Sequence, residues 1–254
     1  MPARRRWNTT VRLCELDQAG QAQPFRILEW FQEAAAYAST LGGFPPDRYV
    51  QMGAAWFIRD VQLSILRAPR YGEAIEVETW VSDLRRFRTR REYLLRVGEE
   101  ILARGQADWL YLERDPKSGK IKPRHPDEEM KTAFAREPAT AISPESVLTF
   151  GPALEVPAQL SPRRVHPHDI DAQGHANHTV YGRWLEDLAL ELEPDTRLSE
   201  LRIEYLADAK VGEQLQVGWQ GGGERYIQWI ERDGQRLARA EVRRRSVTAN
   251  LPTS

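Results

Sequence analysis

The stretch from Asp169 to Leu188, DIDAQGHANHTVYGRWLEDL, places carboxylates, imidazoles and side-chain amides directly ahead of an apolar stripe with helical spacing. A carboxylate can act as a general base toward water, and backbone N–H groups at a helix N-terminus can stabilise a developing oxyanion. Gly174 allows a tight backbone turn, so we expect the amides near His175 and Asn177 to be free to donate. The stretch therefore predicts a hydrolytic site at the start of a helix.

Two side chains of this stretch have more than one role open to them. His175 could hydrogen-bond a substrate carbonyl or orient a base, because the pKa of an imidazole lies close to neutrality; it could also be a cap or a surface residue. Asp171 could activate water, or it could fix the loop by accepting backbone N–H bonds. The histidines of HPHDIDAQGHANH lack a helical pair or a thiolate partner, so we expect no metal site.

The elements that must position these residues occur twice in the chain. DQAGQAQPFRILEWFQEAA, from Asp17, matches DAQGHANHTVYGRWLEDLA, from Asp171, with Asp, Gly and Trp at the same internal offsets. Downstream, APRYGEAIEVE matches DAKVGEQLQVG, where Gly-Glu is followed by alternating apolar residues. The first copy carries an insertion, TLGGFPPDRYVQMG, with the length of a loop or a helical turn. The sequence thus indicates an internal repeat.

Each copy is expected to hold one helix followed by antiparallel strands. Helical spacing of apolar residues predicts helices around 28–38 and 181–192. Alternation predicts strands at 75–81 and 215–219, and further strands in REYLLRV, ADWLYLER, RYIQWIE and RLARAEV, the last two joined by a turn at Asp233-Gly234. The proline-rich residues 138–162 are expected to form an extended surface linker. The repeats then occupy residues 1–137 and 163–254.

One helix wrapped by an antiparallel sheet, twice over, resembles the tandem hot dog fold, an α+β architecture. APRYGEAIEVETWV, RREYLL, ARGQADWLYLERDPKSGKIKPRHPDEE and LRIEYLADAKVGEQL extend the likeness over nearly the whole chain. In their order and spacing they are similar to the acyl-acyl carrier protein thioesterases of plant plastids and bacteria. The resemblance implies a hydrolase of fatty acid biosynthesis that releases free fatty acid by general-base attack of water. It implies acyl carrier protein, bearing a phosphopantetheine-linked acyl chain, as the partner, and no cofactor.

The catalytic pattern of that family places Asp, Asn and His in the order Asp-x-Asn-x-His before the helix, and an acid on a later strand segment. The resemblance puts these roles on Asp171, Gln173, His175 and Asp208. Gln173 keeps the amide but adds a methylene, which displaces its polar atoms by about 1 Å. The resemblance places Ala209 where the plant-type enzymes have a cysteine. Because alanine has no thiol, a cysteine nucleophile is excluded at this position.

The hypothesis is that Asp208, or else Asp171, activates water. His175 and Gln173 would bind the thioester carbonyl. The amides near Gly174 and His175 would hold the oxyanion, and Asn177 would contact the substrate. The remaining histidines of the region, His166, His168 and His178, are interpreted as structural or exposed.

The first copy lacks these groups, because it has Ala19, Gln21 and Ala68 at the positions of Gln173, His175 and Asp208. One active site per chain is therefore expected. The aromatic side chains of the first copy would line an acyl tunnel or form ordinary core; they include Phe31, Trp56 and Phe57.

Composition limits the partners and the compartment. The chain has 36 Lys and Arg against 37 Asp and Glu, so its overall field favours neither nucleic acid nor an anionic membrane. The single cysteine, Cys14, is expected in a strand and cannot form an intramolecular disulfide. No apolar segment follows the basic start and no run approaches a membrane span, so we expect a cytoplasmic protein. The sequence does not decide whether the protein forms a homodimer.

The segment LRRFRTRR could be a solvated strand face or a docking patch for an acidic carrier protein. Its basic residues are Arg85, Arg86, Arg88, Arg90 and Arg91. Three other functions fit the same fold: an acyl-coenzyme A thioesterase, a hot dog dehydratase with a His-plus-acid site, and a protein that binds acyl chains without hydrolysing them.

Overall fold

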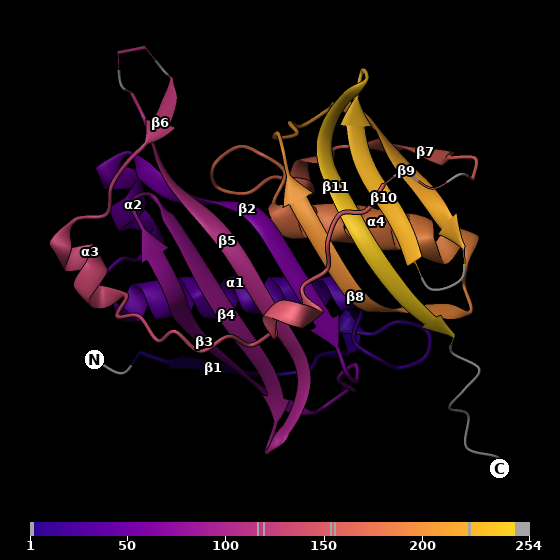
Figure 1. Ribbon diagram of the computed structural model, residues 1–254, viewed down its shortest axis with the longest axis horizontal. Coiled ribbons are helices and arrows are strands. Elements are labelled where there is room, and N and C mark those ends of the chain that lie inside the picture. Colours follow the sequence, from indigo (N-terminus) through magenta and orange to yellow (C-terminus); the bar gives the residue numbers. More distant parts are fainter. Residues whose placement is uncertain are drawn as a thin grey trace. The chain divides into compact units, whose positions relative to one another are not determined.

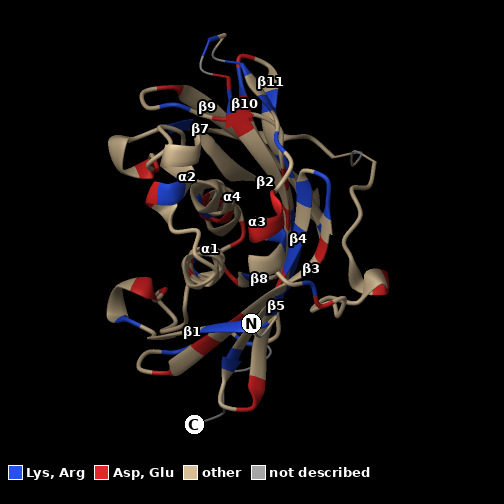
Figure 2. Cartoon of the chain, turned by 90° about the vertical axis from the view of Figure 1, so that its left-hand side faces the viewer, with Lys and Arg blue, Asp and Glu red and all other residues tan. Residues whose placement is uncertain are grey.

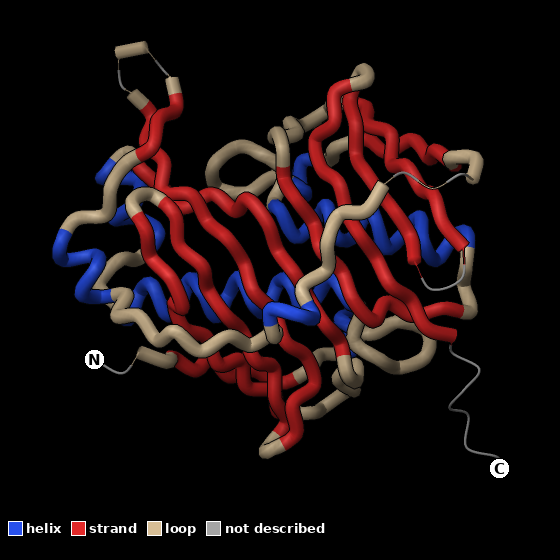
Figure 3. The backbone as a smooth tube through the Cα atoms, in the orientation of Figure 1, coloured by secondary structure: helices blue, strands red, loops and turns tan. Residues whose placement is uncertain are grey.

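The computed structural model describes residues 3–115, 117–118, 120–152, 154, 156–222 and 225–246. The chain divides into two compact units, Met1–Ser146 and Val147–Ser254. Within each unit an antiparallel sheet lies against one long helix, α1 in the first unit and α4 in the second (Figures 1 and 3).

The first unit contains a sheet in the strand order β1-β3-β4-β5-β2, with β6 paired to β5. Every neighbouring pair is antiparallel. Its strands are β1 (Arg5–Thr10), β2 (Ala54–Ile65), β3 (Ala74–Arg85), β4 (Arg88–Val97), β5 (Glu100–Arg114) and β6 (Ile121–Pro123). Its helices are η1 (Leu13–Glu15), α1 (Pro24–Leu41), α2 (Pro46–Met52), α3 (Glu128–Ala133) and η2 (Pro144–Ser146).

The second unit repeats this topology in the strand order β7-β9-β10-β11-β8, again antiparallel throughout. Its strands are β7 (Gln159–Arg164), β8 (Thr196–Tyr205), β9 (Gln214–Gly222), β10 (Arg225–Arg232) and β11 (Gln235–Ser246). Its helices are η3 (Pro167–Asp169) and α4 (His178–Leu192). The predicted duplication and the tandem hot dog architecture are thereby confirmed.

The helix of each unit packs its apolar face on its own sheet. In the first unit the ring of Phe31 stacks on Tyr93 of β4, with 4.7 Å between ring centroids. Gly105 of β5 makes room for this ring, because a Cβ there would lie 2.3 Å from it. In the second unit Trp184 and Leu185 of α4 are buried in the same way. Burial of these faces supplies much of the driving force for folding.

Turns that the sequence predicts are present. Asp233 and Gly234 have φ of 49° and 78°, as a tight hairpin between β10 and β11 requires. Gly72 and Gly212 have φ of 77° and 84° and occupy matching turns ahead of β3 and β9. The insertion in the first copy forms the short helix α2.

Two expectations need revision. Cys14 is exposed in the 3₁₀ turn η1, so its assignment to a strand is wrong. The turn forms because the buried carboxylate of Glu15 accepts a hydrogen bond from the backbone N–H of Arg12. The stretch expected as a linker, residues 138–162, is fastened at both ends: Ala141 donates to Glu92 in the first unit, and β7 already begins at Gln159 in the second.

None of the helices in the described part of the chain is both long and apolar enough to cross a membrane.

Candidate active site

The loop that precedes α4 is shaped by Asp171. Its Oδ1 accepts the backbone N–H of Gln173 at 2.8 Å, and its carbonyl accepts the N–H of Gly174 at 3.0 Å. Gly174 has φ of 82°, a backbone conformation that glycine adopts without steric cost. The N–H of Asp171 donates to the carbonyl of His175 at 2.9 Å, which closes the loop. The predicted tight turn is therefore present.

A backbone hydrogen bond joins this loop to the segment between β8 and β9. The N–H of Ala176 donates to the carbonyl of Ala209 at 2.8 Å. As a result the flanking side chains meet, and Nε2 of His175 lies 3.2 Å from Oδ2 of Asp208. The His175 side chain is 23% exposed and that of Asp208 is 50% exposed, so the pair is accessible to water and to a ligand.

Among the backbone amides of residues 173–177, the N–H of His175 donates to no other group in the described part of the chain. The other four have acceptors: those of Gln173 and Gly174 within the loop, that of Ala176 on Ala209, and that of Asn177 on Asp169. The expectation of a free amide therefore holds at His175 and is wrong at Gly174 and Asn177.

Asn177 is the N-cap of α4. Its Oδ1 accepts hydrogen bonds from the backbone N–H and the hydroxyl of Thr179, both at 3.0 Å. Capping of this kind stabilises a helix start, and it occupies the side-chain oxygen of a residue that was expected to contact substrate. In the 3₁₀ turn η3, which precedes the loop, the buried carboxylate of Asp169 accepts the N–H of His166 and pairs with Arg183. These contacts hold the helix and the loop together.

Gln173 lies at the exposed rim of the loop. Its side chain makes no hydrogen bond to any residue that the structure describes, whereas its backbone N–H serves the Asp171 turn. The structure thus brings His175 and Asp208 together and leaves the Gln173 amide facing solvent.

Tyr181, on the first turn of α4, is a neighbour of Asp208 that the sequence did not single out. Its hydroxyl donates to the carbonyl of Ala207 at 3.3 Å. Burial and the nearby charge of Asp208 raise the pKa of Tyr181, so the phenol stays protonated. The helical stripe predicted its burial, but only the fold shows that it lies beside the segment bearing the acid.

The first unit has the same loop without the same chemistry. Oδ1 of Asp17 accepts the N–H groups of Ala19 at 2.8 Å and Gln21 at 3.1 Å, and Gly20 has φ of 70°. The N–H of Ala22 donates to the carbonyl of Pro69, matching the bond from Ala176 to Ala209. An Asp therefore shapes this loop even where no His and no acid follow, which favours the loop-fixing role for Asp171.

The remaining histidines of this region have other surroundings. His166 and His168 are exposed, with their rings stacked at 5.5 Å. Burial lowers the pKa of His178 to about 4, and its ring packs edge-on against Tyr205. Within the described ranges no cluster of His, Cys, Asp or Glu is arranged to hold a metal ion.

The five arginines from Arg85 to Arg91 do not form one docking surface. Arg91 is buried, with 8% of its surface exposed. Arg90 pairs with Asp108 at 2.8 Å and Arg85 pairs with Asp83 at 2.9 Å. Arg86 and Arg88 remain exposed without a carboxylate partner among the described residues. Acidic and basic residues are interspersed over both units (Figure 2).

Fold and site together define a tandem hot dog protein with the His175–Asp208 pair next to the free backbone N–H of His175. Residues 4–123 match the acyl-ACP thioesterase N-terminal domain, and residues 157–243 match the acyl-ACP thioesterase C-terminal domain. The chain belongs to the acyl-ACP thioesterase family.

Individual relatives of the chain are named as acyl carrier protein thioesterases. The chain is 26% identical over 211 residues to oleoyl-acyl carrier protein thioesterase 1, chloroplastic, of Arabidopsis thaliana, covering 77% of this chain and 58% of that protein. It is 24% identical over 216 residues to palmitoyl-acyl carrier protein thioesterase, chloroplastic, of Cuphea hookeriana, covering 79% of this chain and 50% of that one. The chain thus spans 58% and 50% of the length of these two relatives.

Two solved structures share the fold. The 12:0-ACP thioesterase from Umbellularia californica aligns with a TM-score of 0.84 at 19% identity, over 97% of this chain and 98% of that one. An acyl-ACP thioesterase from Bacteroides thetaiotaomicron aligns with a TM-score of 0.79 at 16% identity, over 96% of this chain and 98% of that one.

Proposed function

We propose that this protein hydrolyses fatty acyl thioesters carried by acyl carrier protein. The observation that supports this most directly is the 3.2 Å approach of His175 Nε2 to Asp208 Oδ2, next to a free backbone N–H. A thioester already has a good leaving group, so its hydrolysis needs mainly an activated water and a donor for the oxyanion. Both lie within the second unit.

In the proposed reaction the carboxylate of Asp208 takes a proton from water as the water oxygen attacks the thioester carbonyl. The tetrahedral oxyanion accepts a hydrogen bond from the N–H of His175. When the intermediate collapses, the C–S bond breaks and the phosphopantetheine thiolate takes up the proton. The products are a free fatty acid and the carrier thiol.

The imidazole of His175 has a positioning role in this scheme. Because Nε2 faces Asp208, a proton on this nitrogen orients the carboxylate toward the attacking water, and Nδ1 is the atom left to contact the substrate. Gln173, at the exposed rim, would contact the substrate from the solvent side. Asp171 then serves catalysis indirectly, by holding the loop that carries His175.

The names of the relatives suggest long-chain acyl groups, oleoyl and palmitoyl, for those proteins. For this chain we propose a fatty acyl group without assigning its length. We also propose a cytoplasmic location from the single exposed thiol of Cys14, whereas the curated relatives are named as chloroplastic.

The test is the release of free thiol from acyl carrier protein thioesters of graded chain length. The wild type should turn over at least one of them, and His175→Ala should lower kcat by about 100-fold or more. His168→Ala is the matched control, because His168 is an exposed imidazole on the same approach to α4. Absence of turnover on every carrier-bound and coenzyme A-bound substrate would refute the proposal and favour a binding role.

A further inference from the structure

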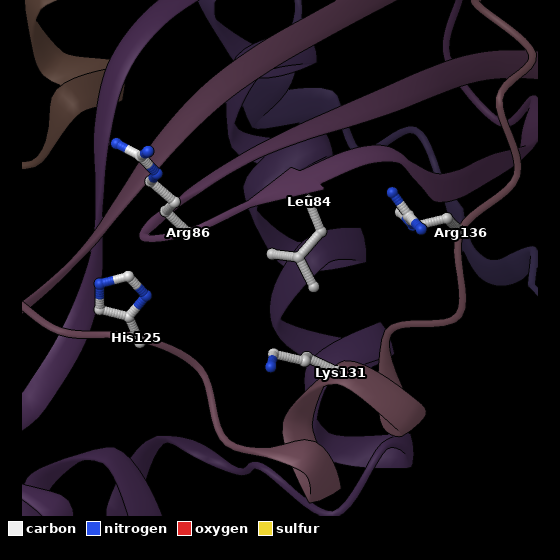
Figure 4. Close-up of a pocket in the computed structure, with 5 residues that line it drawn as sticks. All are labelled: Leu84, Arg86, His125, Lys131 and Arg136. Carbon is white, nitrogen blue, oxygen red and sulfur yellow. The ribbon is translucent and has the colours of Figure 1, made fainter.

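The first unit contains a pocket of about 380 Å³ beside the β3–β4 hairpin. Leu84 and Arg86 reach it from the hairpin, His125 from the segment before α3, Lys131 from α3, and Arg136 from the segment after it (Figure 4). Four of the five lining side chains are therefore basic. This set differs from the arginine run of the sequence, with which it shares only Arg86.

The positive charge of this pocket is poorly compensated. In the part of the chain that the structure describes, no Asp or Glu lines it. Lys131 pairs with Glu128 at 2.6 Å, at the exposed edge. Arg86, His125 and Arg136 have no ion-pair partner among the described residues. Like charges held together without counter-charges repel one another, and an anionic partner would relieve that repulsion.

Two further features of this region are the backbone conformation of Arg86 and the buried side chain of Arg91. Arg86 has φ of 54°, a left-handed conformation that disfavours side chains other than Gly or Asn. The two-residue turn between β3 and β4 requires this conformation, and it holds Arg86 at the tip of the hairpin. The buried guanidinium of Arg91 lies 5.7 Å from the ring of Phe134, which belongs to the cluster that Leu84 packs against. Arg91 has no carboxylate partner among the described residues.

One apolar side chain, that of Leu84, lines the pocket. Leu84 packs against the hydrophobic cluster that includes Met130 and Phe134, and it stays partly exposed between the basic side chains. Basic side chains around an exposed leucine suit a protein surface with carboxylates around an apolar side chain better than they suit a bare inorganic anion. The near-neutral chain has no strong overall field, so attraction of an acidic protein depends on a local patch of this kind.

We propose that this pocket is the docking site of an acidic partner protein, whose carboxylates pair with Arg86 and Arg136 while an apolar residue covers Leu84. This inference rests on the proposed function, under which the partner is the acyl carrier protein. Docking here would raise the encounter rate and lower KM without changing the chemical step.

The experiment compares the wild type with the double variant Arg86→Glu/Arg136→Glu. Arg70→Glu is the control, because Arg70 is an exposed arginine that precedes β3, while the pocket lies at the other end of that strand. The same acyl chain is presented on carrier protein, on coenzyme A and on pantetheine, which has no phosphate. Circular dichroism and thermal melting confirm that each variant folds.

The double variant should raise KM for the carrier-bound substrate by about tenfold or more, with kcat within about twofold of the wild type. Its kinetics on acyl-pantetheine should not change, and Arg70→Glu should behave as the wild type on all three substrates. An unchanged KM for the carrier-bound substrate would overturn the proposal. A rise confined to acyl-coenzyme A would overturn it as well, because the pocket would then bind a nucleotide phosphate.

Direct binding separates this inference from the proposed function. Fluorescence anisotropy of labelled holo-acyl carrier protein measures docking whether or not hydrolysis occurs. Binding that weakens in the double variant, and that falls steeply as salt is added, supports docking at this pocket. Equal binding by the wild type and the variant refutes it, even if the enzyme hydrolyses thioesters.

Discussion

Nε2 of His175 lies 3.2 Å from Oδ2 of Asp208, and the first unit has Gln21 and Ala68 at the two equivalent positions. The two loops share the turn anchored by an Asp and a glycine with positive φ, but the N–H of Gln21 donates to Asp17 whereas that of His175 is free in the described part of the chain. The histidine-carboxylate pair is thus the feature that the second unit adds to a common scaffold.

Replacement of Asp208 by Asn should lower kcat on acyl thioesters by roughly 100-fold to 10,000-fold, because an amide cannot take a proton from water. The fold should persist, since the Asp208 side chain is 50% exposed. Single-turnover thiol release measures the effect. Asp195→Asn, an exposed acid in the same unit, is the control and should leave the rate unchanged. A near-normal rate in Asp208→Asn would remove this carboxylate from the mechanism.

Asp171→Asn should keep kcat within about threefold of the wild type, because the amide oxygen can still accept the N–H of Gln173. Asp171→Ala should lower the free energy of unfolding by about 1 kcal/mol, and Asp17→Ala, which breaks the matching turn of the first unit, should do the same. Denaturant unfolding and steady-state kinetics on the three variants decide the role. A loss of more than about 100-fold in Asp171→Asn would instead identify Asp171 as the base.

His178 should make the protein less stable in mild acid. Burial lowers its pKa from the ordinary 6.5 to about 4, so the unfolded chain binds a proton more readily than the folded one. The stabilisation of the folded state that depends on a neutral His178 is fully present above pH 6.5. It declines as the pH falls and is lost near pH 4; its full size is roughly 3 kcal/mol. Unfolding free energies of His178→Asn and the wild type between pH 4 and 7 should show a smaller pH slope for the variant. Parallel curves would contradict the assignment.

Glu186 and Arg244 form a buried ion pair at 2.9 Å between α4 and β11, and the Arg244 side chain is 0% exposed. Glu186→Gln should destabilise the protein by about 3 kcal/mol, because the guanidinium would lose its counter-charge in a low-dielectric setting. The melting temperature should fall clearly. Arg163 and Glu191, paired at 2.7 Å, offer the comparison, because the Glu191 side chain is 54% exposed: Glu191→Gln should cost less than about 1 kcal/mol. Equal effects would mean that burial does not set the strength of the pair.

The local elements could be predicted from the sequence because their signals are local. Helical spacing indicated α1 and α4, alternation indicated β3 and β9, and Asp233-Gly234 indicated the hairpin that follows β10. The internal repeat predicted the shared topology, since two copies of one pattern fold by the same rules. Cys14 was placed wrongly, because a buried Glu15 bends the chain into a 3₁₀ turn that carries no periodic signal.

By itself, the sequence determined the duplicated hot dog architecture, the family and the residue types at the candidate site. Only the tertiary structure decided which of those residues meet. The backbone bond from Ala176 to Ala209 brings Asp208 to His175, and no spacing rule contains that contact. Capping of α4 commits Asn177, and the sheet buries Arg91 while leaving Arg86 at a hairpin tip. Side-chain roles depend on long-range backbone contacts and burial, which a linear pattern does not specify.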